Sequence, residues 1–223
     1  ATPKKDGGKG DAADLGGTGT DAAGLGDVGT DGGGVDGGAD QGLPDLLLLR
    51  DRLSSKVWLD AKVFTPDSCA FLEGCIENVG QRLLLRFDVV TANVGDVDLV
   101  MGRPTENEDL FIYSECHGHY HFEEYAHYDL RRDDDIVALG HKQAFCLMDT
   151  SRYLEDDETV RERARYNCGF QGISRGWQDV YGSHLDCQWI DVTDLEPGDY
   201  QLSVQINREH IIEEKSYDNN DET

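Results

Sequence analysis

Hydrophobic and polar positions alternate over several stretches of the chain, a pattern typical of half-buried β-strands. One such stretch has its hydrophobic positions at Leu83, Leu85, Phe87 and Val89. A longer one, His119–Arg132, places on its hydrophobic face Phe122, Ala126, Tyr128 and Leu130. Because residues two apart on a strand share a face, a third hydrophobic face is expected to carry Tyr200, Leu202, Val204 and Ile206.

Polar segments between these stretches predict two hairpins. Residues 131–135 read Arg-Arg-Asp-Asp-Asp and form a polar turn, after which Ile136–Met148 is expected to return as a second strand. Cys187–Val192 and Tyr200–Ile206 flank a Pro-Gly turn and make the second expected hairpin. Residues 153–166 are highly charged and favour one exposed helix. The pattern predicts a mainly β fold: a β-sandwich core with long disulfide-stapled loops and little helix.

The first 42 residues have a composition of their own. They hold 15 of the 26 glycines and eight aspartates, and no aromatic residue. Such a segment cannot bury enough apolar surface to offset the chain entropy that is lost on folding. We therefore expect a disordered Gly/Asp-rich tether over residues 1–42 and a catalytic domain over residues 43–223. A weak sequence repeat occurs within the tether, but its spacing is too irregular to favour a calcium-binding repeat.

The chain is strongly acidic, with 20 Lys and Arg against 45 Asp and Glu and a formal net charge of −25. Such a surface cannot displace counterions from phosphates, which argues against a nucleic-acid partner and against attachment to anionic lipid through basic residues. The longest strongly apolar run, residues 46–49, is far shorter than the roughly 20 residues of a membrane-spanning helix, so no transmembrane segment is expected. No basic and apolar leader opens the sequence, so we expect a signal peptide to have been removed or left out.

Lysine is scarce, with seven lysines against 13 arginines. An acid-rich, lysine-poor surface suits a high-salt environment, because at 1 M salt the screening length is only about 3 Å. We therefore expect a salt-loving source organism, with an ordinary acidic protein as the alternative.

The six cysteines form no C-x-x-C pair, which argues against a zinc ribbon. An even number of cysteines in a domain of this size favours three disulfides and an oxidising compartment, so we expect a secreted or cell-surface protein. Six buried free thiols in a cytosolic protein are the alternative. The sequence alone leaves 15 pairings open.

The stretch Cys116-His117-Gly118-His119-Tyr120-His121 carries the most chemical information. In an extended chain its three imidazoles project from one face, with neighbours about 6.6–7 Å apart. Two of them can bind one metal ion directly, and the third joins if the backbone curves at Gly118. His127 and Asp129 have the same parity and are candidates for further ligands or for groups that orient a ligand. Imidazole outside the cell favours copper or zinc in a redox, catalytic or structural role; histidines without a function are the alternative.

These residues resemble the copper motif of the lysyl oxidase family. The similarity runs in order over residues 44–220. Its blocks are residues 116–121, His127-Tyr128-Asp129-Leu130, residues 140–150, Asp179-Val180-Tyr181-Gly182, residues 186–194 and Ser216-Tyr217-Asp218-Asn219-Asn220. The copper block and the block Asp-Cys-Gln-Trp-Ile-Asp at residues 186–191 are the motifs most specific to that family. The sequence resembles a prokaryotic, salt-adapted member of that family.

The resemblance implies a copper-dependent amine oxidase. The copper(II) ligands would be His117, His119 and His121. A lysine tyrosylquinone cofactor would form by cross-linking Lys142 to Tyr181. The enzyme would deaminate lysine ε-amines in peptides or proteins, or other primary amines, to aldehydes, with O2 as oxidant and with release of hydrogen peroxide and ammonia.

The base that removes the substrate's α-proton has two candidates, Asp179 and His127, and either could instead orient a ligand. The resemblance further implies the disulfides Cys69–Cys116, Cys75–Cys187 and Cys146–Cys168, each contributing about 2–4 kcal/mol. A calcium site of the family would take Asp45, the Leu46 carbonyl, Glu214, Asn219 and Asn220. A family aspartate is replaced by Ser216 here, so one charged calcium ligand is missing.

Three functions remain open. The first is the secreted copper amine oxidase that acts on lysine ε-amines. The second is a non-catalytic extracellular copper-binding protein on the same fold, in which Lys142 and Tyr181 stay unmodified. The third is a calcium-dependent extracellular structural module. The sequence favours the first, because the lysine, tyrosine and metal blocks are all present and a module that needs only the fold would use none of them.

Overall fold

The computed structural model describes residues 42–140 and 143–223. The expected tether over residues 1–42 therefore lies, apart from Gly42, outside the described residues. Among the described residues, no helix is long and apolar enough to cross a membrane.

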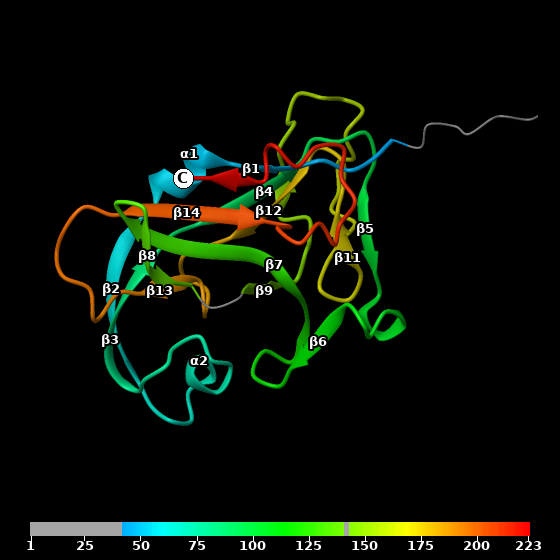
Figure 1. The fold of residues 1–223 in the computed structure, drawn as a ribbon. Helices are drawn as coiled ribbons and strands as arrows, with labels where there is room; N and C mark the ends of the chain where they lie inside the picture. Colours follow the sequence, from blue (N-terminus) through cyan, green and yellow to red (C-terminus); the bar gives the residue numbers. More distant parts are fainter. Residues whose placement is uncertain (1–41, 141–142) are drawn as a thin grey trace, which may run out of the picture. The chain divides into compact units, whose positions relative to one another are not determined.

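Two antiparallel sheets form the main body of the domain (Figure 1). We name each by its central strand. The β4 sheet has the order β1 (Leu46–Leu48), β4 (Val89–Asn93), β12 (Trp177–Tyr181) and β10 (Ser151–Arg152). The β7 sheet is built around the long strand β7 (His119–Arg132). Its other strands are β6 (Phe111–Ser114), β8 (Asp135–Leu139), β9 (Gln143–Phe145), β14 (Gln201–Ile206) and β15 (Asp221–Glu222).

The main hydrophobic core lies between these two sheets. Leu46 and Val89 enter it from the β4 sheet, and Tyr128 and Val204 enter it from the β7 sheet. The rings of Phe87 and Tyr128 meet edge to face, with centroids 5.0 Å apart. A β-sandwich core with little helix is thus confirmed.

A smaller second core lies beside the short helix α2 (Cys69–Leu72). It rests on a separate sheet with the order β13 (Trp189–Asp191), β3 (Gly80–Arg86) and β2 (Trp58–Phe64). Leu84 and Trp189 are buried here, and the Trp189 ring lies 5.9 Å from that of Phe64. The remaining elements are α1 (Arg50–Ser55), a 3₁₀ turn (Pro104–Glu106), and the paired strands β5 (Leu99–Gly102) and β11 (Gln171–Ile173).

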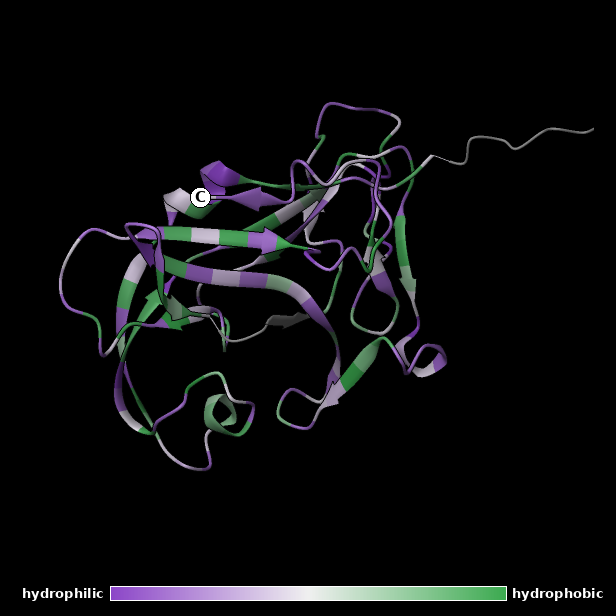
Figure 2. Ribbon diagram, viewed as in Figure 1, coloured by the Kyte–Doolittle hydropathy of each residue, from purple (hydrophilic) through white to green (hydrophobic). Residues whose placement is uncertain are grey.

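The hydrophobic faces predicted for β7 and β14 are confirmed. In β7 the buried positions include Phe122, Ala126, Tyr128 and Leu130. Val204 and Ile206 of β14 are buried, whereas Tyr200 and Leu202 are partly buried at the edge of the same core. Figure 2 shows hydrophobic and hydrophilic positions alternating along β14.

The strand predicted from Leu83 to Val89 is instead split between two sheets. β3 ends at Arg86 and β4 begins at Val89, and they lie in different sheets. In β3 the buried residues are Leu84 and Arg86, because this face packs on the second core. Leu83 and Leu85 instead line an apolar groove of about 720 Å³.

The second predicted hairpin is wrong. β13 pairs with β3, whereas β14 pairs with β7 and β15. The two strands on either side of the Pro-Gly turn therefore belong to different sheets. β13 contributes to both cores, with Trp189 in the second core and Ile190 in the main core, and its pairing partner is β3.

The first predicted hairpin is confirmed, with β8 and β9 as two separate return strands that both pair with β7. The helix predicted over residues 153–166 is wrong. Polar groups outside the segment bind its backbone: Asp149 Oδ2 accepts the N–H groups of Arg165 and Tyr166, and Trp177 Nε1 donates to the Arg161 carbonyl. These contacts hold the segment as a loop of turns and bends, and the charge pattern of the sequence does not reveal them.

Candidate metal centre

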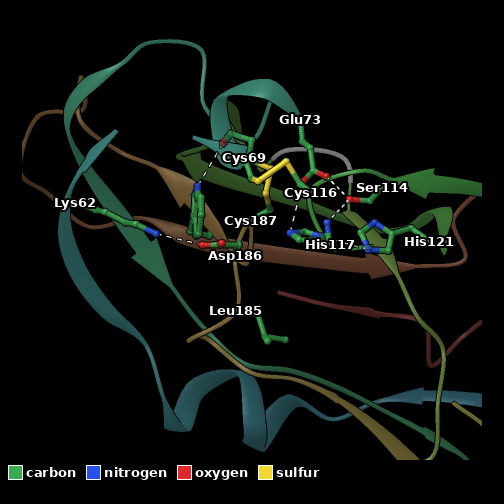
Figure 3. The surroundings of a disulfide bond; sticks show 12 residues. Lys62, Cys69, Glu73, Ser114, Cys116, His117, His121, Leu185, Asp186 and Cys187 are labelled. Atoms are coloured by element: carbon green, nitrogen blue, oxygen red, sulfur yellow. Dashed lines mark hydrogen bonds and ion pairs between the residues drawn. A yellow bond between two sulfur atoms is a disulfide. The ribbon is translucent and has the colours of Figure 1, made fainter. Parts of the chain in front are cut away.

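The three alternating histidines lie at the hairpin between β6 and β7, and Figure 3 shows two of them, His117 and His121. His119 and His121 are in β7 and face Ser114 and Ile112 of β6 in register. His117 is in the turn that connects the two strands. Gly118 closes this turn: its N–H donates to the Ser114 carbonyl at 2.8 Å, and its φ of +70° lies in the left-handed region that favours glycine. The turn supplies the curvature that the third imidazole requires.

The three imidazoles converge. Each offers a ring nitrogen that lies within 4.8 Å of the nitrogens of the other two. His117 Nδ1 lies 3.4 Å from His121 Nε2. The ring centroids are 5.8 Å apart for His117 and His119, 5.1 Å for His117 and His121, and 4.9 Å for His119 and His121. Three nitrogen donors in this arrangement fit a copper or zinc ion.

The surroundings of two of the three histidines favour the neutral imidazole. Burial is the main cause that lowers the pKa of His121 to about 4, and the charges that His119 and His117 would carry lower it further. Burial also lowers the pKa of His119, again reinforced by His117. A metal ion needs the lone pair of an unprotonated imidazole, so these directions favour metal binding at neutral pH.

Tyr181 ends strand β12, where it pairs with Val89 of β4. Its phenol oxygen accepts a hydrogen bond from the Cys146 N–H at 3.0 Å. Burial raises the pKa of the Tyr181 phenol well above its usual range, and the neighbouring Asp179 carboxylate raises it further. The phenol is therefore held in place and neutral.

Cys146 connects this tyrosine to the histidines. Its sulfur and that of Cys168 belong to a group with a His119 ring nitrogen in which all three atoms lie within 4.8 Å of one another. The same sulfur lies 3.3 Å from the carbonyl oxygen of Tyr120. The residue that holds the Tyr181 hydroxyl through its backbone thus touches the histidine strand through its side chain.

Asp179 precedes Tyr181 by two positions and lies on the same face of β12. Its carboxylate accepts hydrogen bonds from the Thr150 hydroxyl at 3.2 Å and the Met148 N–H at 3.4 Å. Burial raises the pKa of Asp179 to about 7, because these hydrogen bonds offset only part of the desolvation of the charged form. A carboxyl group with such a pKa can exchange a proton near neutral pH.

The five residues expected to bind calcium come together beside β1, the edge strand of the β4 sheet. Glu214 is buried and accepts hydrogen bonds from the Leu46 N–H at 2.6 Å and from the side-chain amides of Asn207 and Asn220. Asn219 Nδ2 donates to Asp45 Oδ1 at 2.9 Å.

Two oxygen atoms of this cluster are left without a partner. Among the described residues, the side-chain oxygens of Asn219 and Asn220 are buried and accept no hydrogen bond. A buried acceptor without a donor is costly unless something positive binds it. Two unsatisfied amide oxygens beside the Asp45 and Glu214 carboxylates therefore fit a hard cation such as calcium.

The comparisons with known proteins agree with this geometry. A family model described as lysyl oxidase matches residues 44–223. The chain belongs to the lysyl oxidase family. It is 39% identical over 189 residues to lysyl oxidase homolog 2A of Danio rerio. This alignment covers 79% of this chain and 24% of that protein. It is 35% identical over 191 residues to protein-lysine 6-oxidase of Homo sapiens, which covers 80% of this chain and 44% of that protein. The chain thus spans less than half the length of these two relatives.

This lysyl oxidase domain has the disulfides that the resemblance implied. Cys69 is bonded to Cys116, Cys75 to Cys187, and Cys146 to Cys168, with Cα–Cα distances of 5.7, 5.3 and 5.0 Å. All six cysteines are therefore paired, and no free thiol remains among them.

Two expected site residues are not brought to the histidine cluster, and one lies outside the described part of the chain. The group of converging nitrogens found among the described residues does not include His127, which pairs in register with Gln205 of β14. Asp129 is buried and forms an ion pair with Arg131 at 2.6 Å. Lys142 lies outside the described residues.

Two residues at the site carry no signal in the sequence alone. Glu73 lies 3.7 Å from His117, measured from Oε2 to Nε2. Gln171 is buried, donates to the Tyr120 carbonyl at 2.9 Å and accepts from the Leu147 N–H at 3.1 Å. Both come from segments distant in sequence from the histidines. For Glu73 the one available hint is its spacing from the neighbouring cysteines, and Gln171 has none.

Proposed function

We propose that this lysyl oxidase domain is a copper-dependent amine oxidase that converts lysine ε-amines or other primary amines to aldehydes, with O2 consumed and hydrogen peroxide and ammonia released. The observation that supports it most is the convergence of three imidazole nitrogens within 4.8 Å of one another. The second support is the contact through Cys146, which joins that cluster to the phenol of Tyr181.

His117, His119 and His121 would hold the copper ion, and Lys142 with Tyr181 would form the lysine tyrosylquinone. When present, the ion and the quinone supply the two-electron oxidation of the amine carbon and the return of those electrons to O2. The task of the protein is to position the groups. The Cys146 N–H holds the Tyr181 hydroxyl, while Gln171 fixes the Tyr120 carbonyl between two of the histidines.

Asp179 is the better supported of the two candidates for the base that takes the substrate's α-proton. Its pKa of about 7 matches what a base working near neutral pH requires. It also lies two residues from Tyr181 on the same strand face. His127 remains the second candidate, and a role for either in orienting a neighbouring group is the alternative.

The substrate proposal rests on the family. The human relative in the comparison bears the name protein-lysine 6-oxidase. A net charge of −25 would attract cationic amines at low salt. Three disulfides support a secreted or cell-surface location. The acid excess supports a high-salt setting, in which case the midpoint of thermal unfolding rises as KCl is added.

We propose calcium as a second, structural ion. The ligands would be Asp45, the Leu46 carbonyl, Glu214, Asn219 and Asn220. The unsatisfied buried oxygens of Asn219 and Asn220 are the support. Ser216, which stands where the family has an aspartate, uses its hydroxyl oxygen to accept the Asp218 N–H at 3.2 Å.

The decisive experiment is peptide mass analysis after copper loading. A cross-linked pair of peptides containing Lys142 and Tyr181 is the expected result, together with a positive redox-cycling quinone stain. Separate, unmodified peptides in copper-loaded protein would favour the non-catalytic copper-binding function instead.

A variant experiment complements the mass analysis. Lys142→Ala should abolish peroxide release with an amine substrate and leave copper binding intact. The matched control is Lys215→Ala, which removes an exposed lysine that pairs with Asp96 at 3.0 Å and should leave both properties unchanged. Peroxide release by Lys142→Ala at the wild-type rate would contradict the proposed cofactor.

A further inference from the structure

Glu73 lies in a segment that two disulfides fix on either side (Figure 3). It follows α2 directly, and its own N–H donates to the Cys69 carbonyl at 2.8 Å. Cys69 is bonded to Cys116, the residue before His117. Cys75, two residues after Glu73, is bonded to Cys187. The carboxylate is therefore carried to the histidine turn on a backbone with little freedom.

The Glu73 carboxylate makes two contacts at that turn. Its Oε1 accepts a hydrogen bond from the Ser114 hydroxyl at 2.5 Å. Its Oε2 lies 3.7 Å from His117 Nε2, a distance of an ion pair rather than of a direct hydrogen bond. The Ser114 oxygen in turn accepts the His117 N–H at 3.0 Å. Ser114 thus fixes both the carboxylate and the backbone of His117.

The two ring nitrogens of His117 face different surroundings. Nε2 faces the Glu73 carboxylate, which can act only as a hydrogen-bond acceptor. Nδ1 faces the interior of the cluster, 3.4 Å from His121 Nε2. A carboxylate beside one nitrogen favours the tautomer with the proton on that nitrogen, and it leaves the lone pair on the other.

His117 needs such a support more than the other two histidines. His119 and His121 are held by the pairing of β7 with β6. His117 lies in the connecting turn, outside both strands. Its side chain is about one quarter exposed, at 24%, as is that of Glu73, at 25%. Without a partner at Nε2, its ring could rotate or bind through the wrong nitrogen.

We propose that Glu73, fixed by Ser114, is the positioning residue that orients His117 so that Nδ1 and not Nε2 binds the metal ion. This rests on the proposed copper site. It adds an outer carboxylate to the three imidazoles. In this arrangement the disulfide Cys69–Cys116 holds the segment of Glu73 close to the turn that contains His117.

The first test reads the tautomer without any metal. Long-range ¹H–¹⁵N correlation spectra of the metal-free full chain should show the His117 proton on Nε2. In Glu73→Gln the preference should weaken, because the amide can offer either a donor or an acceptor to the ring. A His117 proton on Nδ1 in the wild-type protein would overturn the proposal, whether or not the protein oxidises amines.

The second test measures copper(II) affinity by competition with a chelator and records the electron paramagnetic resonance spectrum. Glu73→Gln should lower the affinity about 10–100-fold and change the spectrum, as is usual for loss of a group that orients a ligand. Glu77→Gln removes the same charge at an exposed position four residues on and should change neither. Equal affinities and identical spectra for the two variants would overturn the proposal.

Two further variants separate position from charge. Glu73→Asp keeps the charge but withdraws it by one methylene, and it should lose affinity at least several-fold; full wild-type affinity would contradict a positioning role. Ser114→Ala should lose less than Glu73→Gln, since the carboxylate remains. If the wild type binds copper and shows these differences but releases no peroxide, the proposed oxidase function fails and the positioning role stands.

Discussion

The two candidate metal sites of this domain are built in opposite ways. The copper site would take three nitrogen ligands from five consecutive residues, His117 to His121. The proposed calcium site would take oxygen ligands from Asp45 and Leu46 near one end of the described residues and from residues 214–220 near the other. The histidines are partly buried, whereas Glu214 and Asn220 are only 4% and 5% exposed.

The difference lies in what each site does for the fold. The histidine turn is held by disulfides and by β6, so its imidazoles are not needed to keep the chain folded. The oxygen cluster itself joins the first and last parts of the described domain: Glu214 accepts the Leu46 N–H, and the Leu48 N–H donates to the Asn219 carbonyl. Substitutions at the first site should cost metal affinity, and those at the second should cost stability.

Each of the two regions also contains a buried carboxyl group. A substitution of Asp179 should have the largest effect on the free energy of unfolding. Burial raises its pKa to about 7 from a model-peptide value of 3.8. The folded state therefore binds a proton between pH 4 and 7 that the unfolded state has released. The free energy of unfolding falls over that range as pH rises, by on the order of 4 kcal/mol from this group.

Asp179→Asn should remove this dependence. Denaturant unfolding of the metal-free protein should be measured at several pH values. From pH 4 to 7, the free energy of unfolding of the variant should rise relative to that of the wild type. Asp156→Asn, at an exposed position, should follow the wild-type curve. Parallel curves for wild type and Asp179→Asn would mean that the Asp179 pKa is not raised.

His119→Ala tests the separation of metal binding from stability. Loss of one imidazole of three should lower copper(II) affinity by more than about 100-fold, or about 2.7 kcal/mol, which exceeds the usual effect of losing an outer partner. The free energy of unfolding without metal should change by less than about 0.5 kcal/mol, since the side chain is partly exposed. The exposed His184→Ala is the control, and equal affinity for the two variants would count against the site.

Glu214→Ala should do the reverse. It leaves the buried Leu46 N–H and the amides of Asn207 and Asn220 without their acceptor, at a cost of about 2 kcal/mol. Urea unfolding without metal measures this loss, and copper affinity should be unchanged. Glu213→Ala, at the exposed neighbouring position, should have little effect. A Glu214→Ala protein as stable as Glu213→Ala would show that the chain ends are joined by other contacts.

Asn219→Ala should give the smallest effect on the fold. It removes one hydrogen bond to Asp45 but also an unsatisfied buried oxygen, so the loss without calcium should stay below about 1 kcal/mol. Added Ca²⁺ should raise the unfolding midpoint of the wild type more than that of the variant. Mg²⁺ is the control ion, because it prefers a tighter octahedral shell. A wild-type midpoint that does not respond to Ca²⁺ would contradict the calcium site.

The sequence by itself determined the features that depend on near neighbours. The alternation in His119–Arg132 predicted the buried face of β7, because a two-residue period needs only the local strand. The three histidines predicted a metal site for the same reason, with Gly118 supplying the turn. The family resemblance carried the cysteine pairs and the calcium ligands, which no local pattern could have provided.

Only the tertiary structure decided which strands distant in sequence pair and what surrounds each site. Leu83 and Leu85 alternate like core residues, yet neither is fully buried: they line a groove, and the buried residues of β3 are Leu84 and Arg86. The strands on either side of the Pro-Gly turn belong to different sheets, because β13 pairs with β3 and β14 pairs with β7, both distant in sequence. Glu73 and His117 are 44 positions apart in sequence, and the disulfide Cys69–Cys116 links their two segments. Contacts of this range depend on how separate elements pack, and packing is a property of the whole chain rather than of any segment within it.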